Sequence, residues 1–150
     1  MKVNIVFPVL DEERRLEKGI RTTEAFLAKR RDIDAVITIV DNGSTDRTPD
    51  IIKELADVYS NIEYIRLSER GFGLAFREAA KRNRCDIIGY VDVDLSTDIH
   101  YLSKVMKAFE KYDDISVIKG NRLSGKSKVN GRKPLRNCLL YTSPSPRDMR

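Results

Sequence analysis

Two aspartates at alternate positions, Asp92 and Asp94, are the residues of this sequence best suited to hold a divalent cation, and Ser96 follows at the same spacing. Side chains two residues apart on a strand share one face, so both carboxylates can reach one ion where such a strand ends. Mg2+ and Mn2+ prefer oxygen ligands, and Mg2+ is typically held by one or two carboxylates together with phosphates and water. An isolated pair of this kind is more often a set of turn or cap residues. The surrounding segments therefore decide between a metal site and a turn.

Two further polar segments, Pro8–Glu12 and Asp41–Asp46, fall at the same structural place as Asp92–Thr97, directly after an apolar run. In an open parallel sheet the carboxyl ends of the strands lie along one edge, and ligands bind there, in the crevice where the strand order reverses. Asp41 is expected to point into that crevice, where a carboxylate accepts hydrogen bonds from a base N–H or a ribose hydroxyl. Asn42–Thr48 also has the turn and cap residues of a well-made loop. The shared location predicts one site.

The segments that position these residues alternate between continuous apolar runs and amphipathic stretches. The apolar runs predict five strands, at Val3–Phe7, Ala35–Val40, Ile62–Leu67, Asp86–Val91 and Ile115–Lys119. The amphipathic stretches predict helices at Glu12–Arg31, Asp46–Tyr59 and Phe72–Asn83, and a fourth that Thr97 or Asp98 caps. Strands that are apolar throughout are buried on both faces, as in a parallel sheet covered by helices. We therefore expect an α/β fold with a doubly wound, mostly parallel sheet flanked by helices.

The composition narrows the class of protein. A length of 150 residues suits one domain, and 41% hydrophobic with 34% charged residues is typical of a globular chain. No apolar stretch approaches the roughly 20 residues that span a bilayer, and we interpret the apolar N-terminus as a buried strand rather than a signal peptide. Two cysteines without ligand spacing and one histidine argue against a Cys/His zinc site. We expect a cytoplasmic protein with reduced thiols.

Much of the net charge of +5 lies in a late basic segment, made up of Lys119, Arg122, Lys126, Lys128, Arg132, Lys133 and Arg136. The segment is interpreted as a solvated loop, as a clamp for a diphosphate, or as a contact with the anionic cytoplasmic face of a membrane. It lacks the interleaved aromatic residues of a base-stacking platform, so we expect no nucleic-acid partner. The Gly71-Phe72-Gly73 segment is no P-loop, and the first strand leads into no Gly-x-Gly-x-x-Gly, which argues against a dinucleotide-binding domain.

Taken together, the motifs resemble those of the family-2 glycosyltransferases of the GT-A fold. Val3–Glu13 is similar to that family's opening strand and Pro-x-Tyr-Asn-Glu turn, and Val40–Thr48 to its Val-Asp-Asp/Asn-Gly-Ser-Thr-Asp-x-Thr motif. Gly71–Ala75 resembles its Gly-Lys-Gly-x-Ala segment, Asp92–Thr97 its Asp-x-Asp-Leu-Ser-Thr metal motif, and Gly120–Arg122 its Gly-Ser-Arg. The Asp-Leu-Ser-Thr form and the basic segment look most like the dolichyl- or polyprenyl-phosphate hexose synthases.

The resemblance implies roles for individual residues. Those expected to line the nucleotide-sugar pocket are Pro8, Leu10, Glu12, Asp41, Asp92 and Arg122, the last of which would meet the diphosphate or a lipid phosphate. The implied ligands of Mg2+ or Mn2+ are Asp92, Asp94 and Ser96. Leu10 stands where the family has Tyr, and Phe72 where it has Lys. These departures remove a ring that stacks on the base and a positive charge near the diphosphate.

The implied reaction is an inverting, metal-dependent transfer of a hexose from a nucleoside-diphosphate sugar to an acceptor, with a polyprenyl or dolichyl phosphate as the candidate. The cation would neutralise charge on the leaving diphosphate. A lipid phosphate is already anionic and needs little base assistance, so we assign no general base. We expect an incomplete GT-A domain over residues 1–137, C-terminally truncated, and a non-native or disordered tail over 138–150, where two Ser-Pro steps resist helix and strand. Such a chain is expected to bind donor weakly and turn over poorly.

Three other interpretations compete with this one. Asp92-x-Asp94-x-Ser96 mimics an aspartyl-phosphate nucleophile motif, although that motif normally follows the first strand of a phosphotransferase. A sugar nucleotidylyltransferase would need a glycine-rich basic loop after the first strand, where Pro8–Glu13 is acidic. The third is a catalytically incomplete nucleotide-sugar-binding fragment.

Overall fold

A computed structural model describes residues 1–120 of the chain, apart from the side chain of Phe72. Residues 1–107 form one compact unit and a second unit begins at Ala108. The strands are β1 (Lys2–Val9), β2 (Asp34–Asp41), β3 (Ile62–Arg66) and β4 (Ile87–Tyr90). The helices are α1 (Leu16–Ala28), α2 (Thr48–Val58), α3 (Phe72–Arg82) and α4 (Tyr101–Lys111). The last of these begins in the first unit and ends in the second.

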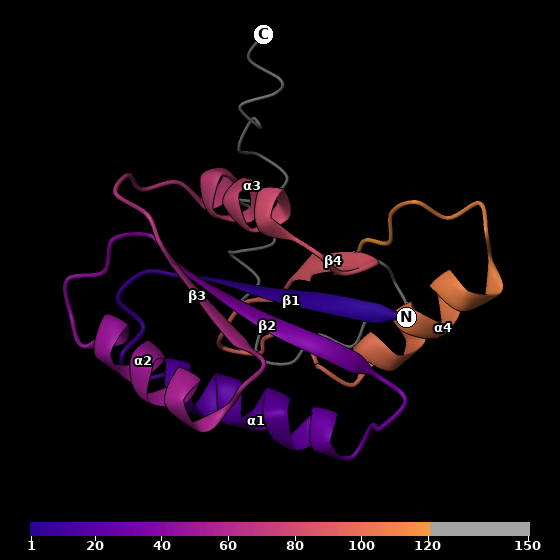
Figure 1. The fold of residues 1–150 in the computed structure, drawn as a ribbon, viewed down its shortest axis with the longest axis horizontal. Coiled ribbons are helices and arrows are strands. Elements are labelled where there is room, and N and C mark those ends of the chain that lie inside the picture. The colour runs from indigo at the N-terminus through magenta and orange to yellow at the C-terminus, as the bar shows by residue number, and fades with distance from the viewer. Residues whose placement is uncertain (121–150) are drawn as a thin grey trace, which may run out of the picture. The chain divides into compact units, whose positions relative to one another are not determined.

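The four strands form one parallel sheet in the order β3-β2-β1-β4 (Figure 1). The chain builds outward from β1 through β2 to β3, and then crosses to the other side of β1 to form β4. The strand order therefore reverses between β1 and β4, which is the place where open parallel sheets bind ligands. Val6 of β1 pairs with Tyr90 of β4. Pro8 and Asp92 therefore each lie two residues beyond this pair along their own segment of chain.

Both faces of the sheet are covered, because the strands are apolar on both sides. Alternate residues of β1 point to opposite faces, so Ile5 and Phe7 join one core cluster while Val6 joins the other. The first cluster contains the buried Leu, Ile and Phe side chains of α1 and α2 together with Met106 of α4. The second contains Ala75 and Ala79 of α3. Figure 1 shows α1 and α2 on one face of the sheet and α3 on the opposite face, which confirms the doubly wound α/β architecture.

The prediction of a strand at Ile115–Lys119 is wrong. After a turn at 113–114, residues 115–120 adopt neither helix nor strand. Val117 is 82% exposed, so the apolar side chains of this run lack the burial on two sides that the central strands β1 and β2 have. Helices α1 and α2 also begin later than predicted, at Leu16 and Thr48, because the residues before them form the loops described below. Within residues 1–120, no helix is both long and apolar enough to cross a bilayer.

Candidate nucleotide-sugar and metal site

The loop that follows β4 carries the paired aspartates on a tight turn. The backbone N–H of Leu95 donates to the carbonyl oxygen of Asp92 at 2.9 Å, which closes the turn. The side chains alternate along it: Asp92, Asp94 and Ser96 are exposed, while Val93 is buried at 4% exposure. Both carboxylates therefore lie on the solvent side of a loop whose intervening residue is anchored in the core.

The conformation of Asp94 is fixed by the residues that follow it. Its Oδ1 accepts a hydrogen bond of 2.9 Å from the backbone N–H of Ser96. Leu95 adopts a left-handed backbone with φ of 51°, which is uncommon for a residue other than glycine and costs free energy. Such conformations persist where the surrounding structure determines them, and here the half-buried Leu95 packs against the first core cluster.

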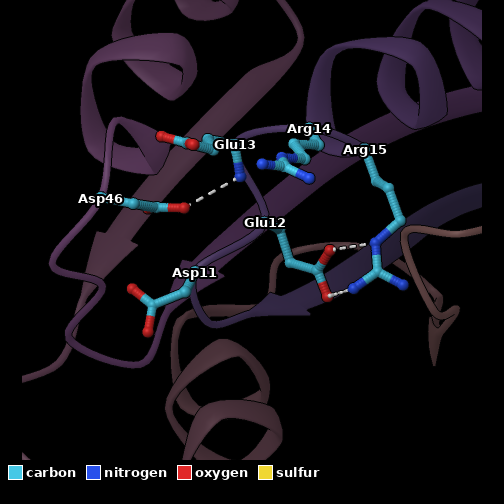
Figure 2. A pocket seen from close by; sticks show the side chains of 6 residues that line it. All are labelled: Asp11, Glu12, Glu13, Arg14, Arg15 and Asp46. Carbon is cyan, nitrogen blue, oxygen red and sulfur yellow. Dashed lines mark hydrogen bonds and ion pairs between the residues drawn. The ribbon is translucent and has the colours of Figure 1, made fainter.

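The loop that follows β1 holds the other predicted pocket residues. Pro8 is half-buried and Leu10 is exposed. The Glu12 carboxylate accepts two hydrogen bonds from the Arg15 guanidinium, at 2.7 and 3.0 Å. A hollow of about 320 Å³ lies at this loop. Figure 2 shows the side chains that line it, which are Asp11, Glu12, Glu13, Arg14, Arg15 and Asp46. Glu12 is the residue of the predicted nucleotide set that lines it.

Hydrogen bonds join the loops after β1 and β2 along their length. The N–H of Asp11 donates to Ser44 Oγ at 2.9 Å, and the N–H of Glu12 donates to Thr48 Oγ1 at 2.8 Å. In return, Asp11 Oδ1 accepts from the N–H of Thr45 at 2.8 Å. The Ser-Thr-Asp-x-Thr residues thus hold the first loop in place. They do not provide the side-chain cap expected for α2, whose N-cap residue is Arg47 and makes no such hydrogen bond.

Replacing Thr48 with valine is expected to lower the free energy of unfolding by about 1–3 kcal/mol, because the N–H of Glu12 loses its buried acceptor. Chemical denaturation of the variant measures this loss. Thr22→Val is the matched control, since Thr22 is exposed on α1 and its hydroxyl donates to the carbonyl of Lys18. Equal stability losses for the two variants would contradict a supporting role for Thr48.

Asp41 ends β2, and its position differs from the one expected. Its side chain is fully buried rather than open to a crevice. One carboxylate oxygen accepts from the N–H of Ser44 at 2.7 Å. The other accepts from the Tyr64 hydroxyl at 3.2 Å and lies 3.7 Å from Arg66 Nε. Direct contact between Asp41 and a base would require one of these groups to move, so its role in nucleotide binding stays a prediction.

Tyr64 and Arg66 are the partners of Asp41 that sequence reasoning missed. Both lie on β3, where Arg66 pairs directly with Asp41 in the sheet. Burial, and then the neighbouring carboxylate, raise the pKa of the Tyr64 hydroxyl, so it remains a donor to Asp41 at neutral pH. Arg66 also donates to the carbonyl oxygen of Ser44 at 3.2 Å. The signal in the sequence is a pair of polar side chains at alternate positions at the end of the strand, Tyr64 and Arg66.

The chemistry of the loop after β4 fits a cation that arrives with a phosphorylated ligand. Within the described residues 1–120, no three carboxylate, imidazole or thiol groups gather closely enough to hold a metal ion. If Asp92, Asp94 and Ser96 were the ligands, as the sequence predicts, they would supply two carboxylates and a hydroxyl, and most of an octahedral shell would be left to phosphate oxygens and water. Mg2+ is usually held in this way. Arg122, the predicted partner of the diphosphate, lies outside the described residues, as does most of the basic segment.

Comparison with known proteins places the chain in a family. Residues 4–149 match the protein family described as Glycosyl transferase family 2. The chain belongs to glycosyltransferase family 2. A dolichyl-phosphate beta-glucosyltransferase of Trichomonas vaginalis is 31% identical over 138 residues, which cover 85% of this chain and 42% of that protein. A dolichol-phosphate mannosyltransferase of Pyrococcus furiosus is 27% identical over 86% of this chain and 35% of that protein. The chain thus spans less than half the length of these family-2 relatives.

Solved structures of other glycosyltransferases share the fold. A mannosyltransferase of Pyrobaculum calidifontis, in complex with GDP-Man and Mn2+, aligns over 70% of this chain and 31% of its own, with a TM-score of 0.61 and 23% identity. TarS of S. aureus aligns over 75% of this chain and 33% of its own, with a TM-score of 0.60 and 19% identity. The family-2 chain therefore has the GT-A fold that its motifs predicted.

Proposed function

We propose that this chain is the donor-binding part of a metal-dependent, inverting hexosyltransferase that transfers a sugar from a nucleoside diphosphate to a polyprenyl or dolichyl phosphate. The observation that carries the proposal is the place of Asp92 and Asp94: an exposed pair of carboxylates on a core-anchored turn, beside the point where the strand order reverses. Membership of glycosyltransferase family 2 supports the class of reaction.

The relatives support the choice of donor and acceptor. Proteins named as dolichyl-phosphate glucosyltransferase, dolichol-phosphate mannosyltransferase and undecaprenyl-phosphate 4-deoxy-4-formamido-L-arabinose transferase all act on an isoprenoid phosphate. The mannosyltransferase with the same fold binds GDP-Man with Mn2+. A lipid-phosphate acceptor would bring the enzyme to a membrane surface, where we propose that it works on the cytoplasmic side.

In this proposal different residues of the chain bind different parts of the donor. Pro8, Leu10 and Glu12 on the β1 loop, with the end of β2 beside them, receive the nucleoside. Asp92, Asp94 and Ser96 would hold Mg2+ or Mn2+, and Arg122 would add a positive charge for the diphosphate. When bound, the cation supplies charge neutralisation on the leaving diphosphate, where negative charge grows as the glycosidic bond breaks.

A thermal-shift panel tests the proposal on the chain itself. UDP-, GDP- and dTDP-hexoses are each added with and without Mn2+, after a cooperative melt of the ligand-free chain shows that it is folded. At 100 times its Kd, a ligand that binds the native state adds about 2.7 kcal/mol of stability. We expect one nucleotide sugar to raise Tm by roughly 5–10 °C with the metal, and by clearly less without it.

Two outcomes would contradict the proposal. One is a folded chain whose Tm no nucleotide sugar shifts at millimolar concentration. The other is a phosphoaspartate adduct, which intact-mass spectrometry detects as phosphate attached to Asp92 or Asp94 after incubation with a phosphoryl donor and Mg2+. That adduct would favour the aspartyl-phosphate interpretation instead.

A further inference from the structure

Helix α1 touches the loop after β4 at a glycine. Gly19 lies in the interior of α1, and a β-carbon there would collide with the backbone carbonyl oxygen of Val93. It would also lie 3.2 Å from the carbonyl carbon and 3.0 Å from Cγ2 of the same residue. The obstructing atoms are mostly backbone, so rotation of a side chain cannot make room. The contact requires a residue without a side chain.

The position of Gly19 in a helix is itself informative. Glycine is the poorest helix former after proline, and its neighbours Leu16 and Ile20 are fully buried, so an alanine would be the natural choice for this face. A glycine at this position weakens the helix, but it allows a close approach between α1 and Val93. By contrast with Gly19, a β-carbon added at Gly73 or Gly89 would meet open space.

Val93 links this contact to the two aspartates. It stands between Asp92 and Asp94, and it is buried in the same core cluster as Leu16 and Ile20 of α1. The turn from Asp92 to Leu95 is closed by a backbone hydrogen bond, and Asp94 is tied to Ser96 N. Because the turn is short and closed, displacement of the Val93 carbonyl moves the residues on both sides of it.

We propose that Gly19 is a positioning residue for the metal site: by letting α1 pack against the Val93 carbonyl, it sets the separation and direction of the Asp92 and Asp94 carboxylates. The proposal rests on the function proposed above and adds to it a residue of α1 that touches neither the donor nor the cation. Groups that orient metal ligands in this way typically contribute a factor of roughly 10–100 to metal affinity.

The experiment compares Gly19→Ala with the wild type in two titrations. The chain is titrated into Mn2+ with nucleoside diphosphate, and protein-bound Mn2+ is followed by the enhanced relaxation of water protons, relative to Mn2+ with the nucleotide alone. The same nucleotide is titrated calorimetrically in EDTA. We expect the affinity for Mn2+ to fall roughly 10–100-fold, while the metal-free nucleotide affinity stays unchanged. A general loss of structure would lower both.

Gly89→Ala is the matched control, because Gly89 lies on β4, the strand that leads into this loop, and a β-carbon there meets open space. It should keep the affinity of the wild type for Mn2+. If Gly19→Ala does not fold, Val93→Ala replaces it: this change removes the buried anchor of the turn without a collision, and the same selective loss of Mn2+ affinity is expected.

Each result has one meaning. A wild-type chain without metal-dependent nucleotide binding would overturn the proposed function, and the positioning role with it. A wild type that binds Mn2+ with the nucleotide, beside a folded Gly19→Ala or Val93→Ala variant of equal Mn2+ affinity, would overturn the positioning role alone. A variant that loses metal-free nucleotide affinity in the same proportion would also overturn it, because the effect would then be general.

Discussion

Replacing Asp94 with alanine is expected to remove the Mn2+-dependent part of nucleotide-sugar binding and to leave the fold intact. Asp94 is exposed, and the hydrogen bond that it accepts from Ser96 lies in a surface turn, so we expect the free energy of unfolding to change by less than about 0.5 kcal/mol. Loss of a group that merely orients a ligand weakens metal binding about 10–100-fold, so loss of a ligand should weaken it by about 100-fold or more. Calorimetric titration of the donor with and without Mn2+ measures the metal-dependent binding, and chemical denaturation measures the free energy of unfolding.

Asp98→Ala controls for charge. Asp98 lies four residues further along the chain, is exposed, and binds the N–H and ring of His100. Both variants lose one negative charge from the same stretch. If Asp98→Ala weakened Mn2+ binding as much as Asp94→Ala, the effect would be a general electrostatic one, and Asp94 would not be a ligand.

Asp41→Ala is expected to lower the free energy of unfolding by about 2–4 kcal/mol, the largest stability effect among the predicted site residues. The buried N–H of Ser44 would lose its acceptor, and the Tyr64 hydroxyl and Arg66 would lose theirs. Ser44 carries most of the penalty, since Arg66 is half exposed and can turn to water. For a chain of this size the loss corresponds to a fall in Tm of roughly 5–15 °C, which differential scanning calorimetry detects.

Asp34→Ala is the control, because Asp34 lies on the same strand as Asp41. Asp34 begins β2, its side chain is 70% exposed, and it lies 3.9 Å from Lys2 Nζ. Exposed ion pairs of this kind contribute about 0–1 kcal/mol, so Asp34→Ala should melt close to the wild type. If Asp41→Ala did so as well, the carboxylate would be open to solvent and free to meet a ligand, as the sequence alone had suggested.

The architecture of this chain can be predicted from its sequence because its two central strands, β1 and β2, are largely apolar. Val3–Phe7 and Ala35–Val40 are buried on both faces, and only a parallel sheet between helices provides that burial. Ile115–Lys119 has a similar pattern but is not a strand, since a run of four apolar or neutral residues before a lysine fits several conformations. The sequence pattern predicts helix starts that are too early, because Glu12 and Asp46 suit the first turn of a helix as well as a hydrogen-bonded loop.

The site could be predicted only in part. Motif order places the loops after β1, β2 and β4 on one edge of the sheet, and neighbouring strands lie about 4.8 Å apart, so the ends of β2 and β4 are about 10 Å apart across β1. The burial of Asp41 depends on Tyr64 and Arg66 from a strand further along the chain, which no local pattern reveals. The role of Gly19 depends on one carbonyl oxygen 74 positions away, and its single local signal is a glycine inside a helix.

Paramagnetic broadening by Mn2+ tests the location of the metal most directly. Amide signals of the 15N-labelled chain are recorded with a nucleoside diphosphate and a small amount of Mn2+, whose unpaired electrons broaden only nearby nuclei. We expect selective loss of the signals of Asp92–Ser96, with weaker effects in the loop after β1, and no selective loss in Asp94→Ala. Broadening centred instead on the acidic hollow around Asp11, Glu13 and Asp46, or on no single region, would contradict a metal-diphosphate site at the end of β4.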